Sequence, residues 1–393
     1  MMADAYLLAG ARTPIGKFLG VFSQTSAIEL GTHAVRASLE RSEIHPGDVQ
    51  EVIMGNVVSA GLGQAPARQV ALQAGIPSTV AALTINKVCG SGLKAVMLAA
   101  QAIRLGDARV IVAGGMENMS QIPHLLIGSR DGFKLGNAIL HDAMLQDGLH
   151  CAFEDCHMGR HAESTARDHD LSREELDRFA MESQQRAARA VSSGEFSDEI
   201  IPVTVKQRRE DIVIEIDEGP RPDTTPEGLA KLRPAFATDG IVTAGNASMI
   251  SDGAAAVVVA DETTAQSSSA KWKAKIIASH TSGGEPKDLF VAPVLAVNAV
   301  LEKAGLSRDD IDLYEINEAF AAQMLACIRS LNLDPAKVNV NGGAIALGHP
   351  IGASGARILV TLLAALHRRN LRRGLATLCL GGGNAVAMIV ERV

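Results

Sequence analysis

The sequence predicts an α/β protein made of two similar halves with a segment of different character between them. Short β-like runs alternate with helix-like stretches in the first 120 residues and again after Asp252, and such alternation is typical of layered α/β folds. The chain has 393 residues, of which 47% are hydrophobic and 21% are charged. This length and composition suffice for two or three globular domains with large cores.

The first half is defined by short apolar runs that we expect to be strands. They are Ala5–Ala9, Val52–Met54 and Val110–Ala113, the last of which is closed by two glycines. Ala27–Glu40 and Leu93–Leu105 carry the spacing of apolar residues that indicates helices.

Residues 121–249 are richer in charge and include the Pro-rich run Gly219–Pro222. One amphipathic helix is expected from Ser172 to Ser192, with Ser172 as its N-cap and Glu175 at the capping-box position. We interpret this region as an insertion. The predicted organisation is an N-terminal half over residues 1–120, completed by about 250–270, the insertion over 121–249, and a C-terminal half over 271–393.

The two outer regions resemble one another. Leu39–Asn56 pairs without a gap with Leu301–Glu318, and Cys89–Gly92 and Gly352–Gly355 each open a helix that leads to an apolar run ending in glycines. Any two βα units look somewhat alike, but the nearly constant offset between the blocks favours a duplicated domain. Solenoid repeats have much shorter periods, of about 20–50 residues.

Composition argues against several classes of partner. The net charge is −7, and the chain has one Trp, two Tyr and nine Phe, which disfavours binding to nucleic acid or to an anionic membrane. No apolar run approaches the roughly 20 residues of a membrane span, and the N-terminus lacks the basic region of a signal peptide. Five scattered cysteines are not a disulfide framework. We therefore expect a cytoplasmic protein with reduced thiols.

Two cysteines lie where a reactive group is expected. Cys89 follows the β-like run Leu83–Ile85 and precedes a helix, so the helix dipole and free N–H groups should favour its thiolate. Cys379 ends a strand and is followed by Gly381–Gly383, whose N–H groups could bind an oxyanion. Either cysteine could instead be a buried, inert side chain.

His349 and Asn317 are further candidates. His349 lies in an irregular loop between Gly348 and Pro350 and could act as general base to a thiol, although a lone loop histidine is usually just solvated. Asn317 follows an apolar strand and could equally cap a helix. No cluster has the spacing of metal ligands, and the residues alone do not show that these groups meet in space.

Taken together, these motifs resemble those of the thiolase family, and of acetyl-CoA C-acetyltransferases in particular. The matching segments are Asn86–Lys94, Asn317–Phe320, Gly348–Gly352 and Cys379–Gly383, and similarity extends from Arg12–Gly16 to the last strand. The resemblance implies the thiolase fold, in which two duplicated halves form a five-layered core with an inserted loop domain.

The resemblance also implies a ping-pong reaction. Acetyl-CoA would acylate Cys89, which His349 activates, and Cys379 would remove the α-proton of a second acetyl-CoA to give acetoacetyl-CoA. One oxyanion hole would combine His349 Nε2 with a water held by Asn317, and a second would use the N–H groups of Cys89 and Gly381. Coenzyme A is then substrate and product, and no cofactor or metal is expected.

Substrate contacts follow from the same resemblance. Arg221 would face the nucleotide end of coenzyme A, although it could also be a solvated charge.

The resemblance has further implications for assembly and chain length. Ser120–Gly136 would build a homotetramer. The family often has Met near Leu289, so Leu289 and the adjacent Phe290 leave the acyl chain length open, whereas Met158 favours short chains. The implied lining of the coenzyme A tunnel is Leu149, His157, Met158, Arg221, Ser248, Leu289, Ala319 and Phe320.

Other interpretations stay open. A degradative 3-ketoacyl-CoA thiolase of broad chain length would use the same catalytic residues. A ketoacyl synthase would lack a second reactive cysteine, so Cys379 argues against it. A non-catalytic CoA- or lipid-binding protein would have lost a catalytic residue, and all four are present. A Rossmann protein is disfavoured because Gly10–Gly16 does not supply Gly-x-Gly-x-x-Gly.

Overall fold

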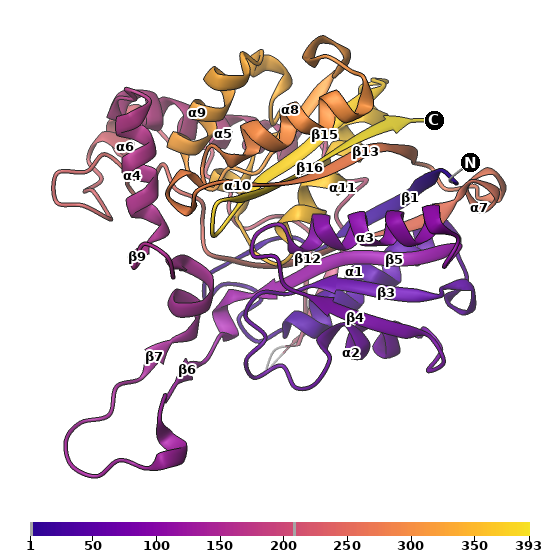
Figure 1. The fold of residues 1–393 in the computed structure, drawn as a ribbon, viewed down its shortest axis with the longest axis horizontal. Helices are drawn as coiled ribbons and strands as arrows, with labels where there is room; N and C mark the ends of the chain where they lie inside the picture. The colour runs from indigo at the N-terminus through magenta and orange to yellow at the C-terminus, as the bar shows by residue number, and fades with distance from the viewer. Residues whose placement is uncertain (1–2, 207–209) are drawn as a thin grey trace.

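A ten-stranded sheet runs through the protein, as seen in a computed structural model that describes residues 3–206 and 210–393. Strands of the N-terminal half occupy one end of the sheet and strands of the C-terminal half occupy the other (Figure 1). β2 (Gly16–Lys17) pairs with β12 off this path. The strand order is β4 (Ala81–Ile85), β3 (Glu51–Gly55), β5 (Val110–Asn118), β12 (Ser251–Asp261), β1 (Ala5–Arg12), β13 (Lys273–Gly283), β16 (Asn384–Arg392), β15 (Arg373–Leu380) and β14 (Leu313–Ile316).

The two halves of the sheet meet at β1 and β13. Their antiparallel register covers only Tyr6↔Lys275, Leu7↔Ala274 and Leu8↔Lys273, whereas β12 and β5 pair from Asp252 to Ala260. The short junction divides the sheet into an N-terminal and a C-terminal part, each of which combines parallel and antiparallel pairs.

The middle layer consists of two helices, α3 (Ser91–Leu105) and α11 (Ser354–Arg368). One core cluster contains both helices together with inward-facing side chains from both parts of the sheet, such as Ile111 and Met388. Because successive side chains of a strand point to opposite faces, the neighbouring residues face outward into separate clusters.

Helices cover the two outer faces as well. α1 (Ala27–Ser42) and α2 (Pro66–Gln73) pack on the N-terminal strands, and α8 (Ala292–Ala304) and α9 (Ala321–Leu331) pack on the C-terminal strands. The order is therefore helices, sheet, helices, sheet, helices. This arrangement is the predicted five-layered α/β core.

The order of secondary-structure elements is the same in the two sequence blocks that resemble one another. Leu39–Asn56 covers the end of α1, a 3₁₀ turn (Pro46–Asp48) and β3, and Leu301–Glu318 covers the end of α8, a 3₁₀ turn (Arg308–Asp310) and β14. β3 runs parallel to β5, and β14 runs parallel to β15. The offset in the sequence thus corresponds to equivalent positions in two copies of one fold.

The chain leaves the N-terminal strands after β5 and returns to them in β12. Within this segment the predicted helix is α5 (Arg173–Ser192), whose Ser172 and Glu175 form the expected capping box. α4 (Met158–Asp168) and α5 pack against α9, and α5 also packs against α10 (Ala344–Leu347). The other elements are β6 (His124–Leu125), β7 (His141–Asp142), a π-helical turn (Met144–Leu149), β8 (His150–Cys151), β9 (Cys156–His157), α4 (Met158–Asp168), β10 (Val203–Val205), β11 (Ile212–Ile214) and α6 (Pro226–Ala230), with α7 (Glu262–Ser267) following β12.

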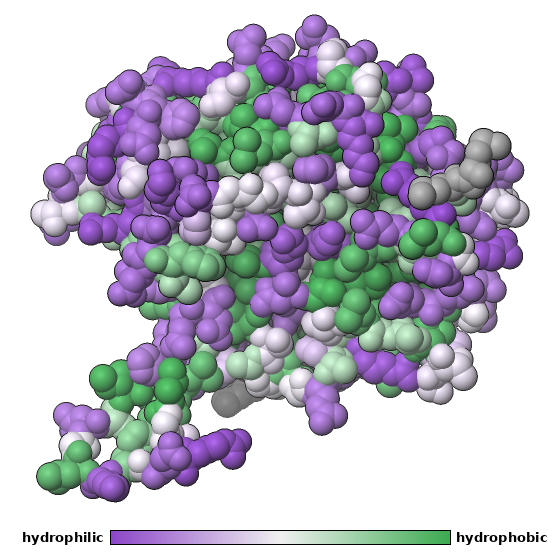
Figure 2. Space-filling view, viewed as in Figure 1, coloured by the Kyte–Doolittle hydropathy of each residue, from purple (hydrophilic) through white to green (hydrophobic). Residues whose placement is uncertain are grey.

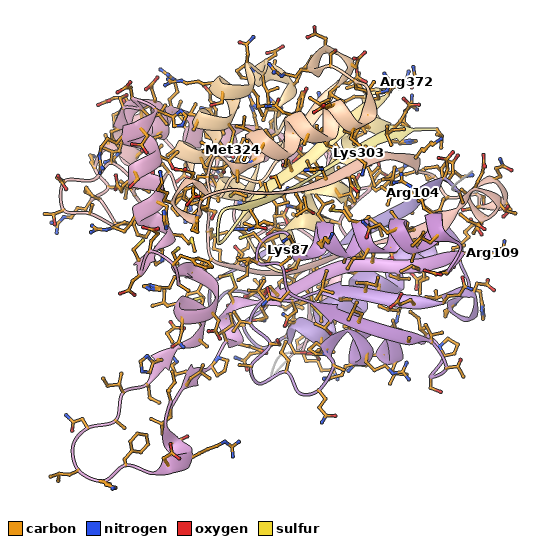
Figure 3. The ribbon with its side chains drawn as sticks, in the orientation of Figure 1. Lys87, Arg104, Arg109, Lys303, Met324 and Arg372 are labelled. Atoms are coloured by element: carbon orange, nitrogen blue, oxygen red, sulfur yellow. The ribbon has the colours of Figure 1, made fainter. Side chains whose placement is uncertain are left out.

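One helical stretch comes closer to the length and hydropathy of a membrane span than the sequence analysis expected. The stretch Val88–Leu105, which contains α3, is long and apolar enough to cross a bilayer by length and composition. In the structure 56% of this stretch is buried, because α3 is the middle layer between two sheet halves. Figure 3 shows Lys87 and Arg104 near opposite ends of this helix, where Arg104 donates to the carbonyl of Ile276 in β13 and Lys87 to Asn384 Oδ1.

Glycines allow α3 and α11 to touch at their first turns. A Cβ added to Gly92 would lie 2.7 Å from the backbone nitrogen of Ala356, and one added to Gly355 would lie 2.4 Å from that of Leu93. Contacts this short leave no room for any side chain. The two helix starts, and the loops that precede them, are therefore held against each other.

Candidate active site

Cys89 lies on a strained turn between β4 and α3. Val88 has a φ of 48°, which is a costly conformation for a β-branched residue, by roughly 1–3 kcal/mol. Asn86 Oδ1 accepts from the Val88 N–H at 2.9 Å, and Ser91 Oγ donates to the Val88 carbonyl at 2.7 Å. These local hydrogen bonds hold the turn that presents Cys89.

The helix N-terminus and the nearby N–H groups, which we expected to favour the thiolate of Cys89, do not keep it ionised in the resting protein. Burial raises the pKa of the Cys89 thiol to about 12, although the N–H groups of Cys89 itself and of Gly381 act in the opposite direction. The cost of burying a charge outweighs the two amide dipoles here. Cys89 is therefore a neutral thiol that needs a base.

His349 is a buried side chain held by its backbone and by one hydroxyl. It follows Gly348, whose φ is 113° and where a Cβ would lie 2.2 Å from Ser251 Oγ, so only glycine fits before it. The His349 N–H donates to the carbonyl of Met249 at 3.0 Å. The imidazole Nδ1 lies 2.6 Å from Ser354 Oγ in the first turn of α11.

The Ser354 contact assigns the tautomer of His349. A serine hydroxyl has a single proton, and that of Ser354 donates to the carbonyl of Pro350 at 2.8 Å. We therefore assign the imidazole proton to His349 Nδ1, which donates to Ser354 Oγ. Nε2 is left with its lone pair, which is the form required of a general base.

Burial also fixes the charge of His349. Its pKa falls to about 3, mainly because burial disfavours the imidazolium and secondly because Arg357 lies nearby. A group with this pKa is neutral throughout the neutral pH range. The Cys89 thiol and the His349 imidazole, which both line the same cavity, are thus both uncharged near neutral pH.

Asn317 lies beside His349 rather than capping a helix. It follows β14, and its N–H donates to the Thr377 carbonyl at 3.1 Å. Asn317 Nδ2 lies 3.4 Å from His349 Nε2, and among the described residues no group donates to its buried Oδ1. The N-cap of the following helix α9 is Phe320.

Cys379 lies near the end of β15, before the glycine-rich turn to β16. Burial is the main cause that raises the pKa of its thiol well above the ordinary value, and the next cause is Cys89. Gly382 and Gly383 have φ values of 80° and 79°, which explains two of the three successive glycines. The third, Gly381, directs its N–H towards the sulfur of Cys89.

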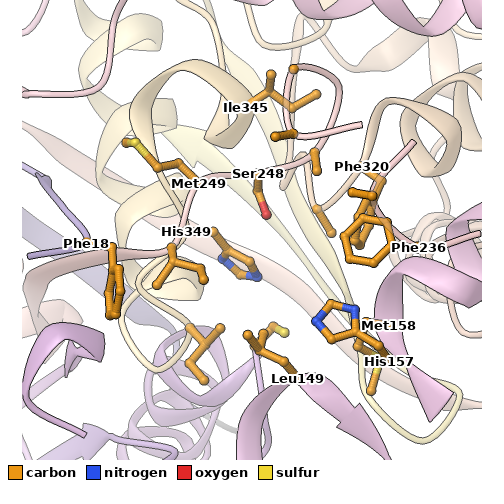
Figure 4. Close-up of a pocket in the computed structure, with 18 of the residues that line it drawn as sticks. Phe18, Leu149, His157, Met158, Phe236, Ser248, Met249, Phe320, Ile345 and His349 are labelled. Carbon is orange, nitrogen blue, oxygen red and sulfur yellow. The ribbon is translucent and has the colours of Figure 1, made fainter. Parts of the chain in front are cut away.

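Most of these groups line one cavity of about 430 Å³. Figure 4 shows His349 among the side chains around it. Cys89, His349, Cys379 and Gly381 line the cavity, whereas Asn317 is not part of the lining and contacts the His349 imidazole. Arg221 is exposed and belongs to the lining, and its N–H donates to Gln184 Oε1 at 2.8 Å. The other lining residues predicted from the sequence are Leu149, His157, Met158, Ser248, Leu289, Ala319 and Phe320.

A wall of stacked rings escaped the sequence analysis. His157 stacks on Phe236 with ring centroids 4.8 Å apart, Phe236 meets Phe320 edge-on at 5.9 Å, and Phe320 meets Phe290 at 5.2 Å. Phe236 lies in a loop without any motif, so no local signal identifies it. Phe18, Met249 and Ile345 also line the cavity. They reach it through tertiary contacts, so the local sequence does not identify them either.

Two buried carboxylates also escaped prediction, and they hold the loops around the site. Glu117 accepts from the N–H groups of Val57 and Gly352, each at 2.9 Å, and burial raises its pKa to about 7. Glu318 accepts from Ser183 Oγ at 2.7 Å and from the Ile345 N–H at 3.1 Å. One carboxylate anchors the start of α11 and the other anchors the segment that leads to His349.

The geometry supplies the parts of a covalent acyl transfer that involves two thiols. A nucleophile with a neutral histidine base, a second thiol and backbone N–H donors open into one largely apolar cavity. Such a set can hold an acyl group on one cysteine while another group reacts with it.

Comparison with known proteins gives the family. The model of the thiolase N-terminal domain matches residues 5–263, and that of the thiolase C-terminal domain matches residues 270–392. Acetyl-CoA acetyltransferases from Pseudomonas aeruginosa and Escherichia coli are each 52% identical, with 100% of both chains covered. The crystal structure of the Bacillus anthracis acetyl-CoA acetyltransferase is 41% identical and superposes with a TM-score of 0.97 over 100% of this chain and 99% of that one.

A second solved structure agrees. Acetyl-CoA acetyltransferase from Syntrophomonas wolfei is 38% identical, with a TM-score of 0.97 and 100% of both chains covered. Both family domains, full-length relatives and the arrangement of Cys89, His349 and Cys379 around one cavity lead to the same conclusion: the chain belongs to the thiolase family.

Proposed function

We propose that this thiolase is an acetyl-CoA C-acetyltransferase, which joins two acetyl-CoA molecules into acetoacetyl-CoA and coenzyme A. The observation that carries the proposal is the convergence of Cys89, Cys379 and a base-form His349 on one cavity. Full-length relatives with that name, at 52% identity, support the choice of substrate.

Acyl transfer to Cys89 starts from neutral groups. Cys89 Sγ attacks the thioester carbonyl while its proton passes to His349 Nε2. The N–H groups of Cys89 and Gly381 receive the developing oxyanion. When the tetrahedral intermediate collapses, the thiolate of coenzyme A leaves and takes the proton from His349, so acetyl-Cys89 and free coenzyme A result.

Condensation then uses the second thiol. Burial makes the Cys379 thiolate strongly basic, so in our proposal it forms only when its proton passes to His349. Cys379 removes the α-proton of the second acetyl-CoA, and the imidazolium N–H, with a water bound to Asn317, stabilises the enolate oxygen. The enolate attacks acetyl-Cys89, and the released Cys89 thiolate regains a proton from His349.

Apart from that water, these proposed steps use only side chains and backbone amides of the chain, with coenzyme A as substrate and product and no separate cofactor. The exposed Arg221 at the cavity is suited to the anionic end of coenzyme A.

Serine substitutions separate the two thiols. In Cys89→Ser, the acetylated enzyme should not form and turnover should fall by roughly 10³-fold or more, as when other covalent nucleophiles are removed. Cys379→Ser should still be acetylated by acetyl-CoA but should fail to condense. Intact-protein mass spectrometry and a condensation assay measure these outcomes.

A buried cysteine outside the cavity is the matched control. Cys327 donates to the Phe290 carbonyl at 3.3 Å, and Cys327→Ser should retain both half-reactions. Condensation by Cys379→Ser at the wild-type rate would disprove its role as the base.

Loss of the Ser354 hydroxyl should make His349 a poorer base but should leave its imidazole in place. Ser354→Ala leaves the Nδ1–H of His349 without an acceptor, and an unpaired buried donor costs about 1–3 kcal/mol. We expect kcat to fall by roughly one to two orders of magnitude with KM little changed. Steady-state kinetics of acetoacetyl-CoA thiolysis at several pH values measure this.

Ser38→Ala is the control for removing a buried helical hydroxyl, because Ser38 Oγ donates only to the Val35 carbonyl, far from the cavity. Ser354→Thr should restore part of the rate. Equal kcat in Ser354→Ala and the wild-type enzyme would contradict the tautomer assignment.

Chain length separates our proposal from a degradative 3-ketoacyl-CoA thiolase. Met158, Leu289 and Phe290 line the cavity, and the last two are each only 2% exposed. Thiolysis of acetoacetyl-CoA should therefore be much faster than thiolysis of a long-chain 3-ketoacyl-CoA. Kinetics with both substrates and coenzyme A test this.

Leu289→Met conserves volume and should leave the preference nearly unchanged. Equal or faster turnover of the long chain would favour the degradative enzyme. Turnover of neither substrate would favour a non-catalytic CoA-binding protein.

We also propose a homotetramer that assembles through the segment expected from the sequence, Ser120–Gly136, together with the rest of the arm to which it belongs, which continues to Asp142. The arm extends from the body and shows hydrophobic surface in the same view (Figures 1 and 2). Burying such side chains against another copy would contribute about 1.5–3 kcal/mol each. Its exposed apolar residues are Leu126, Ile127, Phe133, Leu135, Ile139 and Leu140.

Charges on the arm should prevent this assembly. Leu135→Glu with Ile139→Glu should convert the tetramer to a smaller species in sedimentation velocity. Glutamates buried in the interface would have no partner for their charge. Leu105→Glu, at an exposed site on α3, should sediment like the wild-type protein. A wild-type protein that sediments as a monomer or dimer would contradict the proposal.

A further inference from the structure

The hairpin formed by β8 and β9 places two cysteines opposite each other. Its antiparallel register pairs Cys151 with Cys156 and His150 with His157, and four turn residues connect the strands. Directly opposite residues in such a pair point to the same face, with Cα atoms about 4.5–5.5 Å apart. Disulfides require a Cα separation of about 4.4–6.8 Å.

The two thiols differ in access. Cys151 is buried, with 1% of its surface exposed, whereas Cys156 is partly exposed. Cys156 Sγ lies 3.5 Å from His161 Nε2 in α4, so an imidazole is in place to accept the proton of this thiol. Burial, then Cys151 and Glu154, raises the pKa of Cys156, which makes that acceptor necessary near neutral pH.

We propose that Cys151 and Cys156 are a dithiol site that small disulfides, of the glutathione disulfide type, oxidise to a cross-strand disulfide. Cys156 loses its proton to His161 and attacks one sulfur of the small disulfide, which releases the first small thiol. Cys151 then attacks the mixed disulfide on Cys156 and releases the second. Two protein thiols are oxidised, and one small disulfide is reduced to two thiols that carry the two protons.

The pair is separate from the thiols of Cys89 and Cys379, but the hairpin that carries it contributes to the wall of the same cavity. Leu149 precedes β8, and His157 and Met158 follow Cys156 directly; all three line the cavity. Side chains alternate along a strand, so His157 faces Phe236 and the cavity while the cysteines lie on the other face. A disulfide would fix the hairpin that carries this part of the wall.

Peptide mapping of the full-length protein tests the proposal. The protein is incubated with glutathione disulfide, alkylated under native and then denaturing conditions, and digested with trypsin. Leu135–Arg160 contains both cysteines and no internal Lys or Arg. We expect this peptide to be lighter by the two thiol hydrogens, without alkyl groups or glutathione, and to gain two alkyl groups after reduction. Cleavage after Glu154 should leave its two fragments joined.

Variants establish the order of the steps. Cys151→Ser should stop at a glutathione adduct on Cys156, and Cys156→Ser should react at least tenfold more slowly because only the buried thiol remains. The buried Cys327 should become alkylated only after denaturation in every sample. A persistent glutathione adduct on wild-type Cys156, or two free thiols in this peptide after incubation, would overturn the proposal. These readouts do not depend on catalytic activity.

Discussion

The contact between the first turns of α3 and α11 is the constraint on which the active site depends. Gly92 and Gly355 occupy equivalent positions in the two halves, and each lies against the backbone of the other helix. Cys89 precedes one helix and His349 precedes the other by a few residues. The close approach therefore brings a thiol from one copy of the fold and an imidazole from the other to one cavity, and neither half could form this site alone.

Burial then decides the charge state of the site. Cys89 and Cys379 have raised pKa values and His349 a lowered one, and in each case desolvation is the largest cause. The resting site is consequently neutral, although a helix N-terminus and amide groups surround Cys89. In the proposed mechanism, charges appear only when substrate is present and a proton moves, and the N–H groups of Cys89 and Gly381 receive the oxyanion.

The segment between β5 and β12 adds a wall to the cavity beside the reacting groups. It supplies Leu149, His157, Phe236 and Ser248 to the cavity, and its helices pack on the C-terminal half through α9 and α10. The same segment carries the exposed arm and the paired cysteines of the β8–β9 hairpin. Recognition of the substrate, assembly and redox chemistry are thus proposed for the insertion, while the duplicated halves hold the reacting groups.

Local patterns in the sequence determined the secondary-structure elements and the kinds of candidate reactive side chain. Apolar spacing, the Ser172–Glu175 capping box and the offset between repeats predicted strands, helices and duplication, because each depends on residues close together in the chain or on a repeated local pattern. Only the tertiary structure decided the neutral state of Cys89, the tautomer of His349 and the ring wall with Phe236. These depend on burial and on partners that lie far apart in the sequence, and a linear pattern carries no measure of either.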